Sequence, residues 1–447
     1  MVSNVPPPRQ PKPRDRRSGA RFSAGSILPL MDPQRSAAAI PRPQDGAPFL
    51  RRVKIRNYKS IGKADVELGH LTILVGRNGS GKSNFLDALR FVADSLQTSL
   101  DHAIKSRGGI DSVRRLSTGH PRNFAVAMEV LLPNWLTADY GFEITARQHG
   151  GFSVRRELLR IQSATGAPVA SYQVDSGKVV EASVDNMPPG FSDRLYLVTA
   201  SGLSQFRGVY DTLAAMGFYN LNPDAMKELQ GPDAGELLHR DGSNVASVIA
   251  RLSMDQPRII ERIQSYLSTI VPGITEVERA SLGPRETLQF KQRVVGSSYP
   301  WKFFASSMSD GTLRALGTLV AVTQLAERRN PVSLVGIEEP ETALHPAAAG
   351  ALMDALREAA SHTQVLVTSH SPDLLDQVNP DSDHLLAVIS HEGTTMVAPI
   401  DTASLEAIRN HLYTPGELLR LDQLEPDRED LKRQAQMKLF PGEESEA

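Results

Sequence analysis

Gly76-Arg77-Asn78-Gly79-Ser80-Gly81-Lys82-Ser83 fits the spacing G-x-x-x-x-G-K-[ST] of a phosphate-binding loop. The apolar run 71–75 before it predicts a buried strand, and residues 84–93 after it predict a helix. Glycines let the backbone turn so that consecutive N–H groups point inward, and the helix adds its positive end. We expect the loop to cradle the phosphates of ATP, with Lys82 at the β- and γ-phosphates and Ser83 on Mg²⁺. The alternative is a glycine-rich turn with a chance lysine.

The composition is that of a globular protein. The chain has 447 residues, 40% hydrophobic and 22% charged, which is enough for two or three domains. A formal net charge of −2 means that the whole molecule is not a polycation that must bind nucleic acid. The absence of cysteine excludes disulfides, thiolate metal sites and cysteine nucleophiles. No apolar run approaches the length of a membrane span and no signal-peptide core is present, so we expect a cytoplasmic protein with no membrane partner.

Both ends of the chain differ in composition from the middle. Residues 1–49 are rich in proline and arginine, and we expect them to be a disordered basic tail. A solvated tail, or sequence upstream of a start at Met31, is the favoured interpretation, and an arm that touches nucleic acid is the alternative. Residues 401–447 are expected to be an acidic tail, charge-dense from Glu417 onward and forming a mobile helix or no fixed structure.

Between these ends, the apolar patterns predict an α/β protein with a P-loop NTPase fold, in which a mixed sheet is joined by an antiparallel β subdomain and an inserted helical subdomain. Strands are expected at 52–57, 66–68, 71–75, 124–130, 140–144, 171–174, 195–198, 286–295, 332–337 and 364–368. Helices are expected at 312–328, 346–360 and 372–378, and over most of 206–270. The expected divisions are 50–200 for the N-terminal half of the head with the β subdomain, 201–300 for the mainly helical insertion, and 301–400 for the C-terminal half.

A second group of candidate residues follows the predicted strand 332–337, which ends in Glu338-Glu339-Pro340-Glu341. Carboxylates at the end of a buried strand are costly unless they meet cations. We expect Glu338 to lie near Mg²⁺, through water, and Glu339 to polarise the attacking water as general base. The alternative is a strand that simply ends in acidic surface residues.

The next predicted strand, 364–368, runs into Ser369-His370-Ser371-Pro372. A histidine at a strand end can hydrogen-bond a γ-phosphate or its water, so His370 is a candidate sensor of that phosphate. The alternative is a structural histidine.

Ser309 and Gly311 lie in the segment that opens the predicted helix 312–328. A hydroxyl, a glycine and free helix N–H groups form a second anion-binding surface, which a partner subunit could place against a γ-phosphate. The alternative is an ordinary helix cap, made by Ser309 or Asp310.

Together these blocks resemble the heads of ABC-type ATPases in the branch of the RecF, SMC and OLD-like proteins. The residues that carry the resemblance are Ser309-Asp310-Gly311-Thr312 (signature), Glu338-Glu339 (Walker B and catalytic glutamate), 342–346 (D-loop), His370 (switch histidine), Asn84 after the P-loop, the opening 55–60, and Asp241-Gly-Ser-Asn244. Asn84 and the opening are similar to this branch rather than to transporter subunits. The similarity covers about 50–100 and 300–380 well, and it implies that Asn84 belongs to the nucleotide site.

The resemblance implies that ATP is sandwiched between two heads of a head-to-tail homodimer. Each ATP would contact the P-loop of one subunit and Ser309 and Gly311 of the other. Two positions depart from the family pattern: Glu338 stands where aspartate is more widespread, and Asp310 replaces the second glycine of the signature.

Two appendages of the wider family are not expected. No heptad pattern persists that would predict a coiled-coil arm. Only a short acidic segment follows His391, which is too little for the Toprim nuclease of OLD-like proteins. A nuclease would therefore be a separate partner chain, as in some antiphage defence systems such as Septu.

Three functions remain open from the sequence. The first is an ATPase whose ATP-dependent dimer gates a DNA-linked process, either repair or antiphage defence with a separate nuclease. The second is the nucleotide-binding subunit of a membrane transporter. The third is a scaffold that assembles with ATP and does not hydrolyse it, which the departures at Glu338 and Asp310 allow.

Overall fold

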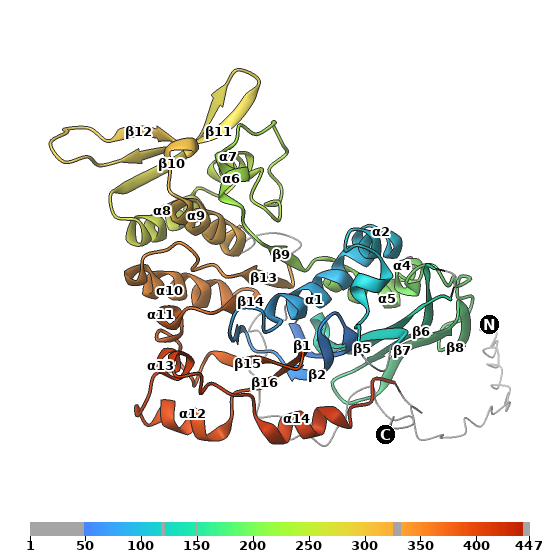
Figure 1. Cartoon of the computed structure of the whole chain (residues 1–447). Helices are drawn as coiled ribbons and strands as arrows, with labels where there is room; N and C mark the ends of the chain where they lie inside the picture. Colours follow the sequence, from blue (N-terminus) through green and yellow to red (C-terminus); the bar gives the residue numbers. More distant parts are fainter. Residues whose placement is uncertain (1–48, 118–120, 149, 325–331, 441–447) are drawn as a thin grey trace, which may run out of the picture.

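The structure is a computed structural model that describes residues 49–440, except 118–120, 149 and 325–331 (Figure 1). The basic tail expected at the N-terminus thus lies outside the described residues, apart from Phe49. Within the described part, thirteen strands form one large mixed sheet and three form a small antiparallel sheet. No helix there is long and apolar enough to span a lipid bilayer.

The large sheet has the order β8-β7-β6-β5-β4-β1-β2-β16-β15-β3-β14-β13-β9. Its strands are β1 (Phe49–Tyr58), β2 (Ile61–Glu67), β3 (Leu71–Val75), β4 (Asn123–Leu131), β5 (Thr137–Ala146), β6 (Phe152–Gln162), β7 (Pro168–Asp175), β8 (Lys178–Ala182), β9 (Gly217–Tyr219), β13 (Leu334–Glu338), β14 (Gln364–Ser369), β15 (His384–His391) and β16 (Thr394–Pro399). The small sheet contains β10 (Ile274–Leu282), β11 (Arg285–Gln292) and β12 (Trp301–Phe304).

The helices cover both faces of the large sheet and build the insertion (Figure 1). They are α1 (Lys82–Gln97), α2 (Leu100–Lys105), α3 (Ile110–Val113), α4 (Tyr196–Ala200), α5 (Ser204–Ala214), α6 (Pro223–Lys227), α7 (Val245–Asp255), α8 (Pro257–Ile270), α9 (Asp310–Thr323), α10 (Ala349–Ala360), α11 (Pro372–Leu375), α12 (Thr402–Arg409), α13 (Pro415–Arg420) and α14 (Arg428–Ala435), with 3₁₀ turns at Pro133–Trp135, Ala305–Ser307 and Pro346–Ala348.

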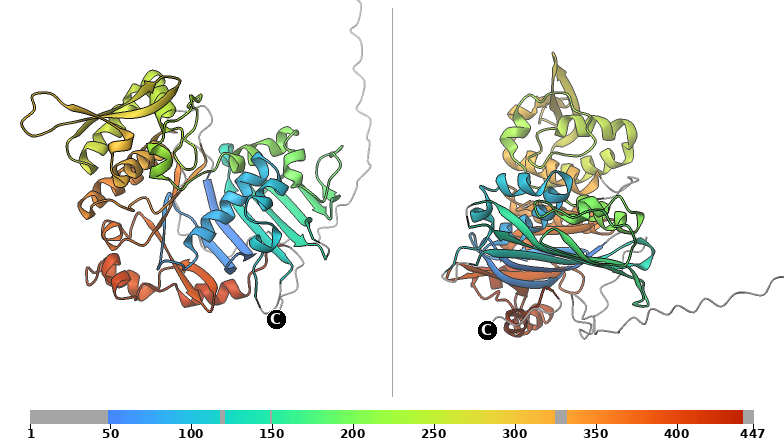
Figure 2. Two further views of the ribbon diagram at one scale, coloured as in Figure 1. Left: turned by 45° about the horizontal axis from the view of Figure 1, so that its top comes forward. Right: turned by 90° about the vertical axis from the view of Figure 1, so that its right-hand side faces the viewer.

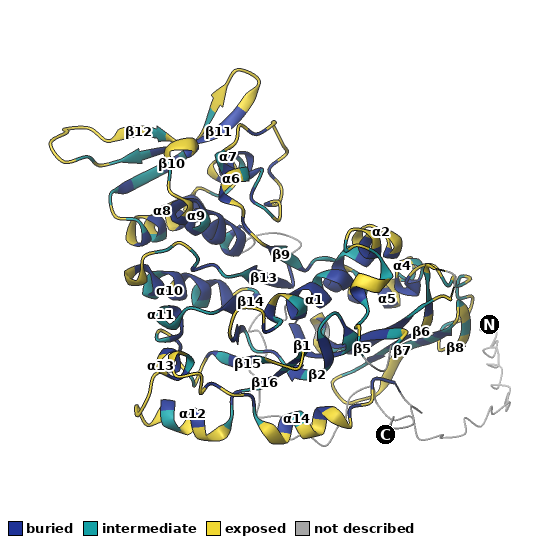
Figure 3. Ribbon diagram, in the orientation of Figure 1, coloured by how far each residue is buried: buried dark blue, intermediate teal, exposed yellow. Residues whose placement is uncertain are grey.

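The strand before the P-loop is apolar throughout because both of its faces are covered. Leu71, Ile73 and Val75 of β3 point into the core that contains α9 and α10, whereas Leu74 points into the core that contains α1. Figure 3 shows α1 and its neighbours largely buried, while much of β12 is exposed. The strand 71–75 and the helix after the loop are confirmed, with the helix extending from Lys82 to Gln97.

Four parallel strands place the predicted site residues at one edge of the sheet. β14 pairs in parallel with both β3 and β13, and β9 pairs with β13. In this register Val75 lies opposite Ser369, and Thr368 lies opposite Glu338. The carboxyl ends of β3, β14 and β13 therefore meet, which is where open α/β sheets bind ligands.

The antiparallel half of the sheet confirms the predicted hairpins, since β4 to β8 form a continuous meander. β6 and β8 were not predicted. The strand expected at 195–198 is wrong, because these residues begin α4. The buried carboxylate of Glu157 accepts hydrogen bonds from the backbone N–H groups of Tyr196 and Leu197, which lie in the first turn of the helix and so have no partner within it.

Glu157 is expected to make the stability of the protein depend on pH. Burial raises its pKa to about 7 from an ordinary value of 4.5, although its hydrogen bonds oppose this shift. Between these two pH values the folded state binds more protons than the unfolded state, so the free energy of unfolding falls as the pH rises. We expect a loss of up to about 3 kcal/mol between pH 4.5 and pH 7.

Chemical unfolding of the wild type and of Glu157→Gln at several pH values in this range checks this. The variant cannot ionise at this position, so the difference in unfolding free energy between the two proteins isolates the contribution of Glu157. Equal pH dependence of both proteins would contradict the prediction.

The segments 201–300 and 401–440 differ from expectation. In the insertion, β11 confirms the strand expected at 286–295, whereas β9, β10 and β12 were not predicted. Figure 2 shows the small sheet standing away from the large one in both views. The chain after residue 401 is not a free tail in its described part: α14 contacts β2 and β16, and Phe440 packs with Ala125 and Leu158. The sequence did not predict this packing because the segment is highly charged and only a few of its residues are apolar and contact the sheet. β15 and β16 were also missed.

Candidate active site

The P-loop connects β3 to α1 and presents Lys82 from the first position of that helix. Gly81 caps the helix with φ of +103°, a conformation that other residues rarely adopt. The Lys82 ammonium donates to the backbone oxygens of Gly76 and Arg77, at 2.8 and 3.0 Å. Lys82 is thus held inside its own loop, where a phosphate could take over its hydrogen bonds.

A chain of hydrogen bonds braces the loop from β16. The Thr395 hydroxyl donates to the backbone oxygen of Ser80 at 2.8 Å, and Ser60 lies 2.7 Å from the same hydroxyl. Asn84 donates its amide to Ser60 at 2.6 Å. A side chain at Gly81 would collide with Thr395, because its Cβ would lie 2.0 Å from the hydroxyl oxygen. In this structure the Asn84 side chain therefore takes part in the hydrogen bonds that hold the loop in place.

The remaining P-loop residues lie at its rim. Arg77 forms an exposed ion pair with Asp422 at 3.1 Å, and its side chain thereby extends toward the segment after α13. Asn78 and Gly79 are exposed, whereas Ser80 is buried and its hydroxyl has no hydrogen-bond partner. These residues line a pocket of about 390 Å³. An unpartnered buried hydroxyl beside turned backbone N–H groups fits a phosphate-binding loop.

The acid pair at the end of β13 lies at the P-loop. Glu338 hydrogen-bonds with the Ser83 hydroxyl, and burial raises the pKa of Glu338 although this hydrogen bond opposes the rise. Burial lowers the pKa of Lys82, and the negative charges of Glu339 and Glu341 oppose that shift. The structure thus brings Lys82, Ser83 and the acidic residues together from opposite ends of the sequence.

His370 faces the predicted general base. Its Nδ1 lies 3.0 Å from Oε1 of Glu339, and both side chains are about one-third exposed. Glu339 has φ of +44°, and its backbone N–H donates to the carbonyl of Thr368 on the neighbouring strand. This backbone hydrogen bond fixes the position of the Glu339 backbone, from which its carboxylate side chain extends.

Glu341 is a positioning residue that the sequence did not identify. Its carboxylate accepts the Ser369 hydroxyl at 2.6 Å and the backbone N–H of His370 at 3.3 Å. Burial raises its pKa, and these hydrogen bonds oppose the rise. The acidic run at 338–341 was the available signal, because its last carboxylate had no assigned partner.

The signature segment combines a helix cap with a tight backbone contact. Ser309 accepts the backbone N–H of Thr312 at 3.2 Å, so it is the N-cap of α9. Asp310 pairs with Lys227 at 2.5 Å, which offsets the added negative charge. Ser309 and Gly311 line a pocket of about 570 Å³ together with D-loop residues. This pocket shares no lining residue with the P-loop pocket.

Gly311→Ala is expected to displace the D-loop and to lower the free energy of unfolding by about 1–3 kcal/mol. A Cβ at Gly311 would lie 2.2 Å from the carbonyl oxygen of Ala343, which is backbone and cannot rotate away. Gly317→Ala, on the same helix, is the matched control because its Cβ would meet only the flexible ends of the Leu221 and Met226 side chains and no backbone atom. Urea unfolding checks the pair, and equal effects of the two substitutions would contradict the prediction.

The residues present fit a magnesium ion that is bound together with a nucleotide. Among residues 49–440 with their gaps, no three histidine, aspartate or glutamate side chains cluster in a way that could hold a metal alone. Ser83 and Glu338, which interact with each other, would offer two oxygen ligands to such an ion. Mg²⁺ is typically held by one or two protein groups, with phosphate oxygens and waters completing its octahedron.

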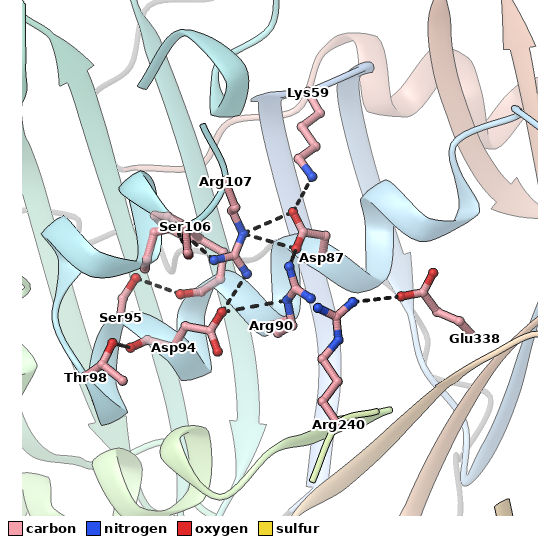
Figure 4. A network of polar contacts seen from close by, with 12 residues as sticks. Lys59, Asp87, Arg90, Asp94, Ser95, Thr98, Ser106, Arg107, Arg240 and Glu338 are labelled. Atoms are coloured by element: carbon pink, nitrogen blue, oxygen red, sulfur yellow. Dashed lines mark hydrogen bonds and ion pairs between the residues drawn. The ribbon is translucent and has the colours of Figure 1, made fainter. Parts of the chain in front are cut away.

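A charged network behind the site anchors α1 (Figure 4). Asp87 accepts the Tyr58 hydroxyl at 2.8 Å and forms ion pairs with Lys59, Arg90 and Arg107. In the same view, the guanidinium of Arg240, from the insertion, reaches Glu338. The sequence predicted neither the network around Asp87 nor the contact between Arg240 and Glu338.

Comparisons with known proteins identify one matching family and several similar proteins. Residues 71–376 match a family model described as "AAA domain, putative AbiEii toxin, Type IV TA system". The DNA replication and repair protein RecF of Gloeobacter violaceus is 26% identical over 300 residues, which cover 66% of this chain and 72% of that protein. RecF of Trichlorobacter lovleyi is 44% identical over 48 residues, or 10% of this chain and 13% of that protein. A crystal structure of an SMC head bound to the C-terminal winged-helix domain of ScpA is 14% identical, with a TM-score of 0.49, and the match covers 80% of this chain and 99% of that one.

Proposed function

The chain belongs to the AAA domain family that its residues 71–376 match, and from this premise we propose that it binds and hydrolyses ATP with Mg²⁺ in an ATP-sandwiched homodimer. The observation that carries the proposal is the meeting of Lys82 and Ser83 with Glu338 and Glu339 at the carboxyl edge of the parallel strands. The convergence of these distant segments supports a site for a cation and phosphates at this edge.

Each residue has a distinct part in the proposed reaction. The P-loop backbone and Lys82 hold the phosphates, and Ser83 and Glu338 would hold Mg²⁺, which neutralises charge on the phosphate oxygens. Glu339 accepts a proton from the attacking water. His370, 3.0 Å from Glu339, orients that water or contacts the γ-phosphate. Glu341 fixes the loop of His370.

Dimerisation and a DNA-linked role are further parts of the proposal. Ser309 and Gly311 line a pocket apart from the P-loop, which supports contact with the nucleotide of a second copy. The relative named as a DNA replication and repair protein supports a task on DNA. Antiphage defence with a separate nuclease chain is the other form of such a task, and a cytoplasmic location accords with both.

ATP binding and phosphate release by the full chain and by Lys82→Ala test the proposal. We expect the wild type to bind ATP and release phosphate, and the variant to do neither, because Lys82 supplies the charge in the loop. Duplex DNA is added at two salt concentrations, since nonspecific affinity for DNA depends steeply on salt. A wild type that binds ATP but releases no phosphate in any condition would be an ATP-dependent scaffold. A wild type that binds no ATP would refute the whole proposal.

A further inference from the structure

An arginine from the insertion contacts one of the two proposed magnesium ligands. The guanidinium of Arg240 lies 3.4 Å from Oε1 of Glu338, and the two side chains are 47% and 21% exposed (Figure 4). Glu338 also hydrogen-bonds with Ser83. A cationic side chain therefore competes for the same carboxylate that Mg²⁺ would use.

The backbone delivers Arg240 to this place. The N–H of Asn220 donates to the carbonyl of Arg240 at 3.0 Å, and the N–H of Asn222 donates to that of Asp241 at 2.9 Å. Residues 220–222 continue β9, which pairs in parallel with β13, the strand that ends in Glu338. Arg240 is thus fixed beside the end of β13 by main-chain hydrogen bonds rather than by its own flexible side chain.

The loop that carries Arg240 is organised by one buried amide. The Asn244 side chain accepts the backbone N–H of His239 at 2.7 Å, and donates to Asp233 at 3.0 Å and to the carbonyl of Leu237 at 2.9 Å. Asn244 lies directly before α7, so a movement of the loop would be transmitted to the insertion. These contacts give a structural reason for the Asp241-Gly-Ser-Asn244 motif.

Arg240 also lines a polar pocket of about 690 Å³ that Glu338 does not line. Its lining residues are Asn220, Leu221, Asn222, His239, Arg240, Asp241, Ser243 and Arg314. The guanidinium can therefore leave Glu338 and remain among polar groups and solvent, which avoids the cost of burying an unpaired charge.

We propose that Arg240 is a positioning residue. It forms an ion pair with Glu338 while Mg²⁺ is absent, and this ion pair breaks when Mg²⁺ binds to Glu338 together with ATP. The loop 233–244 thereby responds to occupancy of the nucleotide site. The inference rests on the proposed function. A divalent ion at about 2 Å attracts a carboxylate more strongly than a half-exposed guanidinium at hydrogen-bond distance, so Mg²⁺ wins this competition.

The test is the Mg²⁺ requirement for binding of a fluorescent ATP analogue, measured by titrating Mg²⁺ into the full chain. Arg240→Gln removes the competing cation, so half-saturation should need about two- to fivefold less Mg²⁺, the range of an exposed ion pair. Affinity for the analogue in excess EDTA should stay unchanged. Arg240→Lys should restore the wild-type requirement. Arg314→Gln, in the same pocket, is the matched control and should also behave as wild type.

A purely structural role of Arg240 predicts a different result, namely weaker analogue binding with and without Mg²⁺ and no gain in Mg²⁺ affinity. An unchanged or increased Mg²⁺ requirement in Arg240→Gln overturns the inference, and so does an equal shift in Arg314→Gln. If the wild type binds no analogue at any Mg²⁺ concentration, the proposed function has failed as well. Hydrogen exchange of residues 233–244 in the wild type gives a second readout, and it should increase when Mg²⁺ and ATP are added together.

Discussion

Glu339→Gln is expected to lower the rate of ATP hydrolysis about 10²- to 10³-fold while ATP binding is retained. General bases contribute about 10²–10⁴ to enzymatic rates, and an amide cannot accept the proton of the attacking water. Gln has nearly the shape of Glu, so the backbone N–H of residue 339 can still donate to Thr368 and hold the strand end in place. The loss should appear in the turnover number and not in the affinity for ATP.

Steady-state phosphate release and equilibrium ATP binding on the same preparations check this result. Because hydrolysis would separate the heads, Glu339→Gln should also accumulate a dimer when ATP is present, which light scattering coupled to size exclusion detects. Glu341→Gln provides the comparison: it acts through Ser369 and the backbone of His370, so its effect on turnover should be smaller. Hydrolysis at the wild-type rate by Glu339→Gln would show that another group is the base.

The sequence predicted those parts of the site whose residues lie close together in the chain. A strand, a glycine-rich loop and a helix are consecutive in the chain, and their order alone fixes where Lys82 and Ser83 stand. The acid pair was placed correctly at a strand end because a buried apolar run that stops at two carboxylates is rarely accidental. That Glu338 reaches Ser83 is a tertiary contact, which the structure supplies.

What the sequence did not predict are contacts between segments without a motif of their own. Thr395 braces the P-loop from β16, more than 300 positions away, and a lone threonine carries no signal for this. Arg240 reaches Glu338 because β9, a three-residue edge strand, lies beside β13. Propensity patterns do not detect so short a strand. The packed C-terminal segment was missed because its charge outweighed the apolar residues that dock it.

Asp87→Asn is expected to cost about 3 kcal/mol of folding free energy, a large effect for the change of a single side chain. The Arg107 side chain is only 2% exposed, and Asp87 is its principal counter-ion. Removing one partner of a buried ion pair leaves the other charge uncompensated, which typically costs 3–5 kcal/mol. Lys59 and Arg90 are more exposed and can turn to water, so they add less.

The pH dependence of this effect follows from the same contacts. Burial raises the pKa of Asp87, but Arg107, Arg90 and Lys59 outweigh burial and lower it to about 2 from an ordinary value of 3.8. The stabilisation is therefore fully present above pH 3.8 and is lost as the pH falls toward 2, because protonation removes the charge that Arg107 needs. The difference in unfolding free energy between wild type and Asp87→Asn should accordingly shrink between pH 5 and pH 2.5.

Urea unfolding of both proteins at these two pH values measures the effect. Asp94→Asn is the matched control, because Asp94 also pairs with Arg107 but is 34% exposed, so it should cost less than 1 kcal/mol, roughly the value of a solvated pair. If Asp94→Asn destabilises the protein as much as Asp87→Asn does, Asp87 is not the main counter-ion of Arg107 and the prediction is wrong. Since α1 begins at Lys82, weaker anchoring of that helix should also weaken ATP binding, and Asp87→Asn would then link the stability of the fold to the nucleotide site.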